Sequence, residues 1–233
     1  MTTSIMIKPV LHAPDTWAIW SPEDPRTEAR GSNCSIEELS NWYGIRSPIW
    51  NKLVDGADLK PEVMIVGENP SKNNNKIING PDILIQCFHS NSVLDRSLKT
   101  AIEQVGFFKG AYMTDAFAWA YEEDDKKISL GEIKKNHPNI WQEIYHEAKM
   151  AFVKNINEGK GSSAIIALGN DAFRYIQEFL QFTTDIQPRV KKFEVASVKN
   201  NLRVYRVDHP SPLNARYRGL FIQQLKAIAK DLE

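Results

Sequence analysis

The chain of 233 residues has little cysteine, no long apolar run and no net charge. Its two cysteines, Cys34 and Cys87, have no paired spacing, which argues against a disulfide framework, a CxxC zinc site and a four-cysteine iron–sulfur cluster. No apolar run approaches the roughly 18 residues of a membrane span. The N-terminus also lacks the parts of a secretory signal peptide. We therefore expect a cytoplasmic protein without a membrane partner.

Charge is balanced over the whole chain but not locally. Lysine plus arginine equals aspartate plus glutamate at 29 each, so the global charge neither favours nor excludes nucleic acid. Residues 189–218 contain eight basic residues against two acidic ones, a net charge of +6. Such a segment fits a rim that faces a phosphate-bearing partner, or a solvated surface.

Hydrophobic periodicity indicates alternating strands and helices. Short apolar runs at 62–66, 110–114, 164–168 and 202–207 are typical of strands buried in a sheet. Patterns with helical spacing separate these runs, so we predict one three-layer α/β/α domain around a short, mostly parallel sheet of four strands. We assign this domain to residues 61–233. Residues 1–60, which are rich in tryptophan, are predicted to be a helical extension packed on the core.

Two loops stand out because each follows a predicted strand and is stiffened by proline. Residues 66–71 read Val-Gly-Glu-Asn-Pro-Ser, and residues 209–214 read His-Pro-Ser-Pro-Leu-Asn. Ligands bind beyond the carboxyl ends of strands in an open α/β sheet. The two loops are therefore expected to place Asn69 and His209 on either side of one crevice. A turn residue before proline and a structural histidine are the simpler alternatives.

These two loops resemble the first and second motifs of the uracil-DNA glycosylase superfamily, and the resemblance spans about residues 60–230. It implies a flipped-out base in a pocket, a positioned water and stabilisation of the departing base. By resemblance Asn69 would hold the water. His209 would donate a hydrogen bond to the leaving base.

The resemblance also assigns base recognition. Asp115 stands where the family has a base-reading asparagine, Phe88 is the candidate for stacking on the base, and Glu68 lies beside Asn69 in the first motif. An ionised aspartate only accepts hydrogen bonds, so a cytosine-type or modified base becomes plausible beside uracil. A helix-cap role for Asp115 and core packing for Phe88 are the alternatives.

The second loop and its flanks would contact DNA. Its tip is expected to enter the duplex as a wedge that offsets the cost of unstacking. Neighbouring hydroxyl and guanidinium groups are placed for phosphate contacts. The residues assigned to DNA binding are Ser71, Ser211, Pro212, Leu213, Asn214, Arg216 and Arg218.

Together these features predict a monofunctional DNA glycosylase, because neither motif contains a lysine that could form a Schiff base. We expect no organic cofactor, no metal, a monomer, and duplex or single-stranded DNA as the partner. Two alternatives stay open: a DNA-binding module with little or no catalysis, and a hydrolase of small nucleosides or nucleotides. The sequence leaves open whether the role is DNA repair or defence against modified foreign DNA.

Overall fold

The computed structural model describes residues 7–12, 15–26, 34–44, 47–68, 88–90, 92–123, 126–182, 194–197, 202–210 and 218–233. The strands are β1 Ile7–His12, β2 Thr16–Trp17, β3 Lys60–Gly67, β4 Ala111–Asp115, β5 Trp119–Glu123, β6 Lys126–Ile128, β7 Ala164–Leu168, β8 Glu194–Ser197 and β9 Arg203–Val207. The helices are α1 Ile36–Tyr43, α2 Pro48–Asp55, α3 Val93–Val105, α4 Leu130–Asn136, α5 Pro138–Asn157, α6 Asn170–Leu180 and α7 Arg218–Leu232. Among these described helices, none has the length and apolarity needed to cross a membrane.

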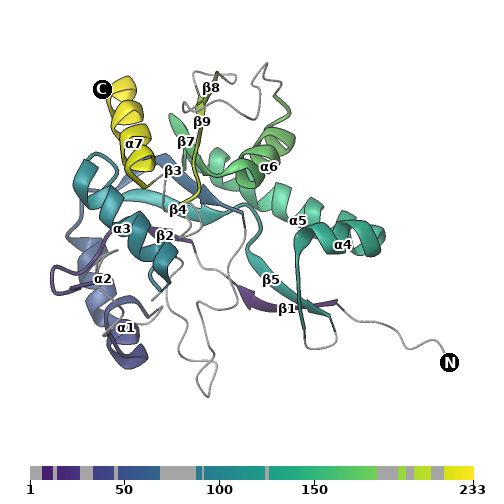
Figure 1. Cartoon of the computed structure of the whole chain (residues 1–233), viewed down its shortest axis with the longest axis horizontal. Coiled ribbons are helices and arrows are strands. Elements are labelled where there is room, and N and C mark those ends of the chain that lie inside the picture. The colour runs from purple at the N-terminus through teal and green to yellow at the C-terminus, as the bar shows by residue number, and fades with distance from the viewer. Residues whose placement is uncertain are drawn as a thin grey trace.

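Within the described residues, the central sheet has six strands in the order β2-β4-β3-β7-β9-β8 (Figure 1). Its inner strands β4, β3, β7 and β9 run parallel, as predicted. The antiparallel strands β2 and β8 add an edge on each side, which enlarges the predicted four-stranded sheet. Strands β8 and β9 pair antiparallel, with Glu194 opposite Arg206 and Ser197 opposite Arg203.

Helices cover both faces of this sheet, so the predicted three-layer α/β/α architecture is confirmed. Successive side chains of a strand point to opposite faces, and β3 places Val63 and Ile65 on one face and Met64 and Val66 on the other. The first pair packs in a core with α3 and α7, and the second pair packs in a core with α5 and α6 (Figure 1). A strand buried on both faces accounts for its continuous apolar sequence.

The described part of residues 1–60, predicted to be a helical extension, contains helices α1 and α2 and also strands β1 and β2. Ser35 begins α1 with a capping box to Glu38, and Ser47 caps α2. Strand β2 joins the central sheet by pairing with β4, while β1 pairs with β5 in a separate three-stranded sheet that ends at β6. Residues 122–123 of β5 pair with residues 126–127 of β6 in antiparallel register. The division at residue 60 stays a prediction.

The inner strands bring their carboxyl ends to one edge of the sheet. Gly67 at the end of β3 is in register with Asp115 at the end of β4. Leu168 at the end of β7 is in register with Val207 at the end of β9. The segments that follow these four positions therefore meet at a common edge, which is where an open α/β sheet binds its ligands.

Candidate active site

Gly67 and Asp115 form the first half of the candidate site. Beyond their paired register, the backbone N–H of Ala116 donates to the oxygen of Gly67 at 2.9 Å and that of Phe117 to the oxygen of Glu68 at 3.0 Å. Asp115 is 9% exposed and sits at the end of β4, with β5 as the next element. The helix-cap alternative for Asp115 is therefore wrong, because no helix begins there.

Phe88 approaches the same point from a distant part of the chain. A Cβ added to Gly67 would lie 3.2 Å from Cζ of the Phe88 ring and would overlap Oδ1 of Asp115. The absent side chain of Gly67 therefore provides the space in which Phe88 and Asp115 come together. Phe88 is buried and belongs to the core between the sheet and α3, so it packs in the core and also borders the candidate base site.

His209 forms the second half of the candidate site, at the end of β9. A Cβ on Gly169 would lie 3.2 Å from Cβ of His209, and the N–H of Gly169 donates to the oxygen of Val207 at 2.9 Å. Gly169 has φ of +94°, in the region that favours glycine, and it is the N-cap of α6. This glycine thus lets the turn after β7 pass directly beside His209.

Gln224 on α7 fixes the residue before His209, and sequence reasoning missed it. Its Oε1 accepts from the backbone N–H of Asp208 at 2.9 Å, and its Nε2 donates to Oδ2 of Asp208 at 3.2 Å. Gln224 is 5% exposed, and a buried amide with both ends bonded is a rigid clamp. The only sequence signal is a polar residue next to the apolar stripe of the last helix.

Asp171 couples the two halves electrostatically, and it was not predicted as a site residue. Burial raises the pKa of Glu68 above its usual value, and the negative charge of Asp171 adds to this rise. Burial lowers the pKa of His209, and Asp171 partly opposes that change. The imidazole of His209 is therefore neutral at neutral pH, with one ring N–H to donate. Asp171 itself pairs with Arg174 at 2.9 Å.

Several predicted site residues lie outside the described residues, so their placement stays a prediction. They include Asn69 of the first motif and most of the residues assigned to DNA binding, namely Ser71, Ser211, Pro212, Leu213, Asn214 and Arg216. Arg218 begins α7.

The basic segment 189–218 is described only in part. Arg203 of this segment is bonded to Asp231 at 3.0 Å, and Arg206 donates to Asn170. These two guanidinium groups are thus engaged within the protein. The predicted basic rim would depend on the other lysines and arginines of the segment.

A cavity of about 250 Å³ lies on the α5 side of β4. Asp115 and Thr114 line it, together with Asp15 and Asn155, whereas Glu68, Phe88 and His209 do not. Its polar corner is already satisfied internally, since Asp15 accepts from Thr114 Oγ1 at 2.6 Å and from the Tyr112 hydroxyl. We therefore locate the candidate site on the edge between Gly67, Phe88, Asp115 and His209 rather than in this cavity.

Metal-binding geometry is also not found in the described part of the chain. There, no group of three or more His, Cys, Asp and Glu side chains is placed to hold a metal ion. The side chains gathered at the sheet edge instead offer hydrogen-bond donors and acceptors, an aromatic ring and a titratable imidazole. Such a set can bind and polarise a planar polar group.

Comparisons with known proteins assign the family. No curated protein matches the chain. Residues 54–233 match the Uracil DNA glycosylase superfamily, from the end of α2 to the end of the chain. The match covers β3 with Gly67, β4 with Asp115, and β9 with the His209 loop, which are the elements that build the candidate site. The chain therefore belongs to the Uracil DNA glycosylase superfamily.

Proposed function

We propose that the chain is a monofunctional DNA glycosylase that hydrolyses the N-glycosidic bond of a flipped-out uracil-like or cytosine-type base. Family membership supports a glycosylase-type activity on DNA. The observation that carries the finer proposal is the buried carboxylate of Asp115 beside Gly67 and the ring of Phe88. An ionised carboxylate there accepts from N3–H of uracil or from the exocyclic amine of cytosine, and it repels a carbonyl oxygen.

The chemistry assigns one role to each motif. Asn69, directly after Glu68, holds the attacking water by a hydrogen bond. His209 donates a hydrogen bond to the departing base as negative charge develops on it, which is the stage at which a fixed donor lowers the barrier most. The lowered pKa of His209 supports this role, because the imidazole is then neutral before the reaction and carries one ring N–H that it can donate.

DNA is the proposed partner, held by the second loop and its flanks. Leu213 and its neighbours Pro212 and Asn214 would wedge into the duplex and fill the space that the extruded base leaves. Ser71, Ser211, Arg216 and Arg218 would contact phosphates, which fix the register of the protein on the strand.

A base panel tests the proposal. Oligonucleotides that carry uracil, hypoxanthine, xanthine, cytosine and modified cytosines are incubated with the protein, and abasic sites are cleaved with alkali. We expect scission on at least one of them, and a sharp loss of scission with Asn69→Ala or His209→Ala. Scission that persists unchanged in both variants would refute the assigned roles.

The same panel separates the alternatives. Absence of scission on every base, together with DNA affinity that falls as salt rises, would favour a binding module of the same fold. Cleavage of free nucleosides in the absence of DNA affinity would favour a small-molecule hydrolase.

A further inference from the structure

We propose that the buried ion pair of Asp24 and Arg26 is a strut that positions Phe88 in the base site. Arg26 Nη1 donates to the backbone oxygen of His89 at 3.0 Å and to that of Ser90 at 2.7 Å, the two residues that follow Phe88. The inference rests on the proposed glycosylase function. It assigns to the N-terminal part of the chain a role in base recognition that neither motif contains.

The opposite edge of the Arg26 guanidinium is held by the carboxylate of Asp24. Its Nε donates to Oδ1 of Asp24 at 2.8 Å, and its Nη2 donates to Oδ2 at 2.7 Å. The side chains of Arg26 and Asp24 are 2% and 0% exposed. A planar fork that is bonded to a carboxylate on one side and to two carbonyls on the other has a single orientation. Arg26 therefore fixes the distance between residue 24 and the backbone after Phe88.

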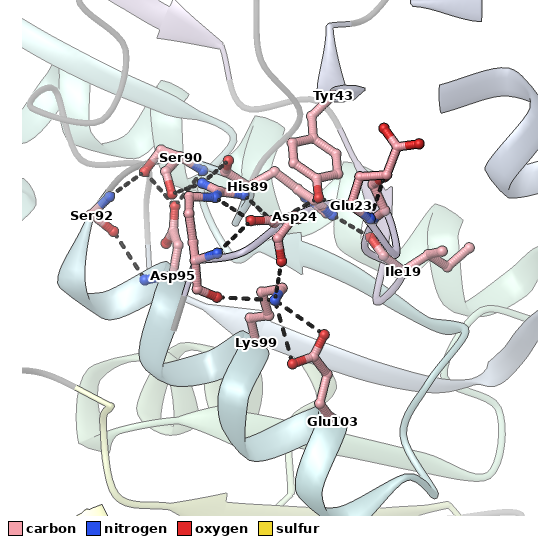
Figure 2. Close-up of polar contacts among 12 residues, drawn as sticks. Ile19, Glu23, Asp24, Tyr43, His89, Ser90, Ser92, Asp95, Lys99 and Glu103 are labelled. Atoms are coloured by element: carbon pink, nitrogen blue, oxygen red, sulfur yellow. Dashed lines mark hydrogen bonds and ion pairs between the residues drawn. The ribbon is translucent and has the colours of Figure 1, made fainter. Parts of the chain in front are cut away.

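Two further helices hold the strut in place. The hydroxyl of Tyr43 on α1 donates to Oδ2 of Asp24 at 2.7 Å. Lys99 on α3 donates to the backbone oxygen of Asp24 at 3.3 Å and to that of Arg26 at 3.0 Å. Figure 2 shows Tyr43 and Lys99 approaching Asp24 from different sides, with Glu103 beside Lys99. The strut is thus a crosslink between α1, α3 and the Phe88 segment.

The segment after Phe88 is fixed on its other sides as well. The N–H of Ser90 donates to Oδ2 of Asp95 at 2.9 Å. The His89 ring stacks on Trp20 at 5.3 Å, packs against Trp50 at 5.1 Å, and contacts the oxygen of Ile19 at 2.8 Å through Nε2. Residues 89 and 90 therefore have little freedom, and this constraint passes directly to Phe88.

Phe88 needs such a constraint. Its φ is +62°, a left-handed conformation that a side chain with a Cβ adopts at a cost. A backbone conformation of this kind persists only where the surroundings impose it. In this conformation the ring lies against Gly67, within reach of the space beside Asp115. Without the strut we expect Phe88 to relax, and its ring to leave the position from which it could stack on a base.

Arg26→Met tests the strut by removing the four side-chain hydrogen bonds while keeping an apolar chain of similar length. We expect kcat for base release to fall by roughly 10- to 100-fold, as for a misplaced positioning group. Affinity for undamaged DNA should stay unchanged, because phosphate contacts supply it. Phe88→Ala should then add little to the loss in Arg26→Met, since both changes remove the same contribution. Full activity of Arg26→Met, or losses that simply multiply, would overturn the proposal.

A matched control separates positioning from general stability. Ile133→Ala removes a fully buried side chain of α4 from the opposite core and lowers the melting temperature without touching residues 88–90. Assayed well below its melting temperature, Ile133→Ala should keep the base-release rate of the wild type. A loss in this control equal to that of Arg26→Met would overturn the positioning role.

Hydrogen exchange tests the strut independently of catalysis. In Arg26→Met, amide exchange should accelerate at residues 88–90 and stay unchanged in β7. If the wild-type protein releases no base, the glycosylase proposal fails and the exchange result alone decides the strut. Unchanged exchange at residues 88–90 would overturn the strut even in an active enzyme.

Discussion

Gly67 and Asp115 lie side by side at the ends of adjacent parallel strands, so closely that a Cβ on Gly67 would overlap Oδ1 of Asp115. A glycine is thus needed at position 67 because the Asp115 carboxylate leaves no room for a side chain, and not because of the backbone conformation of Gly67. It makes the end of β3 flat at the point where the carboxylate of one strand and the Phe88 ring of another segment meet. A planar base fits such a surface.

Gly67→Ala should therefore displace the Asp115 side chain and reduce base release. We expect kcat/KM to fall by about 10- to 100-fold, as for a misplaced recognition group. Gly131→Ala is the matched control, because a Cβ there would meet only Ser129 Oγ at 4.0 Å. Single-turnover kinetics of both variants on the preferred base make the comparison. Equal rates for Gly67→Ala and the wild type would contradict the tight contact.

Asp115→Asn should shift base preference toward uracil. The amide keeps the shape of the carboxylate and adds a donor that matches O4 of uracil. We expect the ratio of kcat/KM for uracil over a cytosine-type base to rise by roughly tenfold, the effect of one well-placed hydrogen bond. Competition between two labelled oligonucleotides measures this ratio directly. A ratio unchanged within error would show that Asp115 does not contact the base edge.

Asp171→Asn should move the acid limb of the pH profile to lower pH. Burial already holds the pKa of His209 below its ordinary value, and Asp171 partly opposes this. Removing the Asp171 charge lowers the pKa of His209 further, so the neutral donor persists to lower pH. The pKa of Glu68 falls in the same variant, because Asp171 contributes to its rise.

The shift is measured as kcat/KM against pH at low and high salt, since Asp171 is largely exposed and its effect should be screened. Glu158→Gln provides the control, because this carboxylate lies beyond α5 at the opposite end of the sheet. An acid limb that moves to higher pH in Asp171→Asn would contradict the assigned donor role.

Asp24→Asn should destabilise the fold by about 3–5 kcal/mol, because it leaves the buried guanidinium of Arg26 without its counter-charge. It should also flatten the acid side of the stability curve. Burial raises the pKa of Asp24, but bonds from Arg26 and Tyr43 outweigh this and lower it below 3.8. The contribution of Asp24 to the free energy of unfolding is therefore complete above the pKa that Asp24 has in the unfolded chain. It is lost as the pH falls through the lower pKa that Asp24 has in the folded protein.

Denaturant unfolding of wild type and Asp24→Asn between about pH 3 and 6 tests this prediction, since unfolded aspartate titrates near pH 3.9. The difference between the two proteins should shrink toward acid pH. Subtracting the free energy of unfolding of Asp24→Asn from that of the wild type removes the contribution of Asp95, which is present in both proteins. Burial raises the pKa of Asp95, so its contribution to the pH dependence of stability has the opposite sign. A constant difference across the range would contradict the lowered pKa.

Much of the sheet was predictable because its signals are local. The apolar runs at β3, β4, β7 and β9 and the helical spacing of α5 and α6 are written into consecutive residues. Helix caps are equally local signals, since Ser35 and Ser47 cap α1 and α2 by accepting from backbone N–H groups three residues later. Helix α3 shows the limit of such signals, because Ser92 is its N-cap although Asp95 in its first turn is also of a residue type that caps helices. Asp95 turns instead toward Ser90, a contact outside its own helix.

The sequence by itself determined the order of strands and helices, the two loops at strand ends, and the family to which they belong. Only the tertiary structure decided that β2 completes the sheet beside β4, that Gln224 clamps Asp208, and that Arg26 reaches the backbone after Phe88. Periodicity and capping depend on neighbours a few residues apart. The contacts that only the tertiary structure revealed join positions far apart in the chain. Each is made by individual polar groups, which leave no repeating pattern in the sequence. Their partners become known only when the chain is folded.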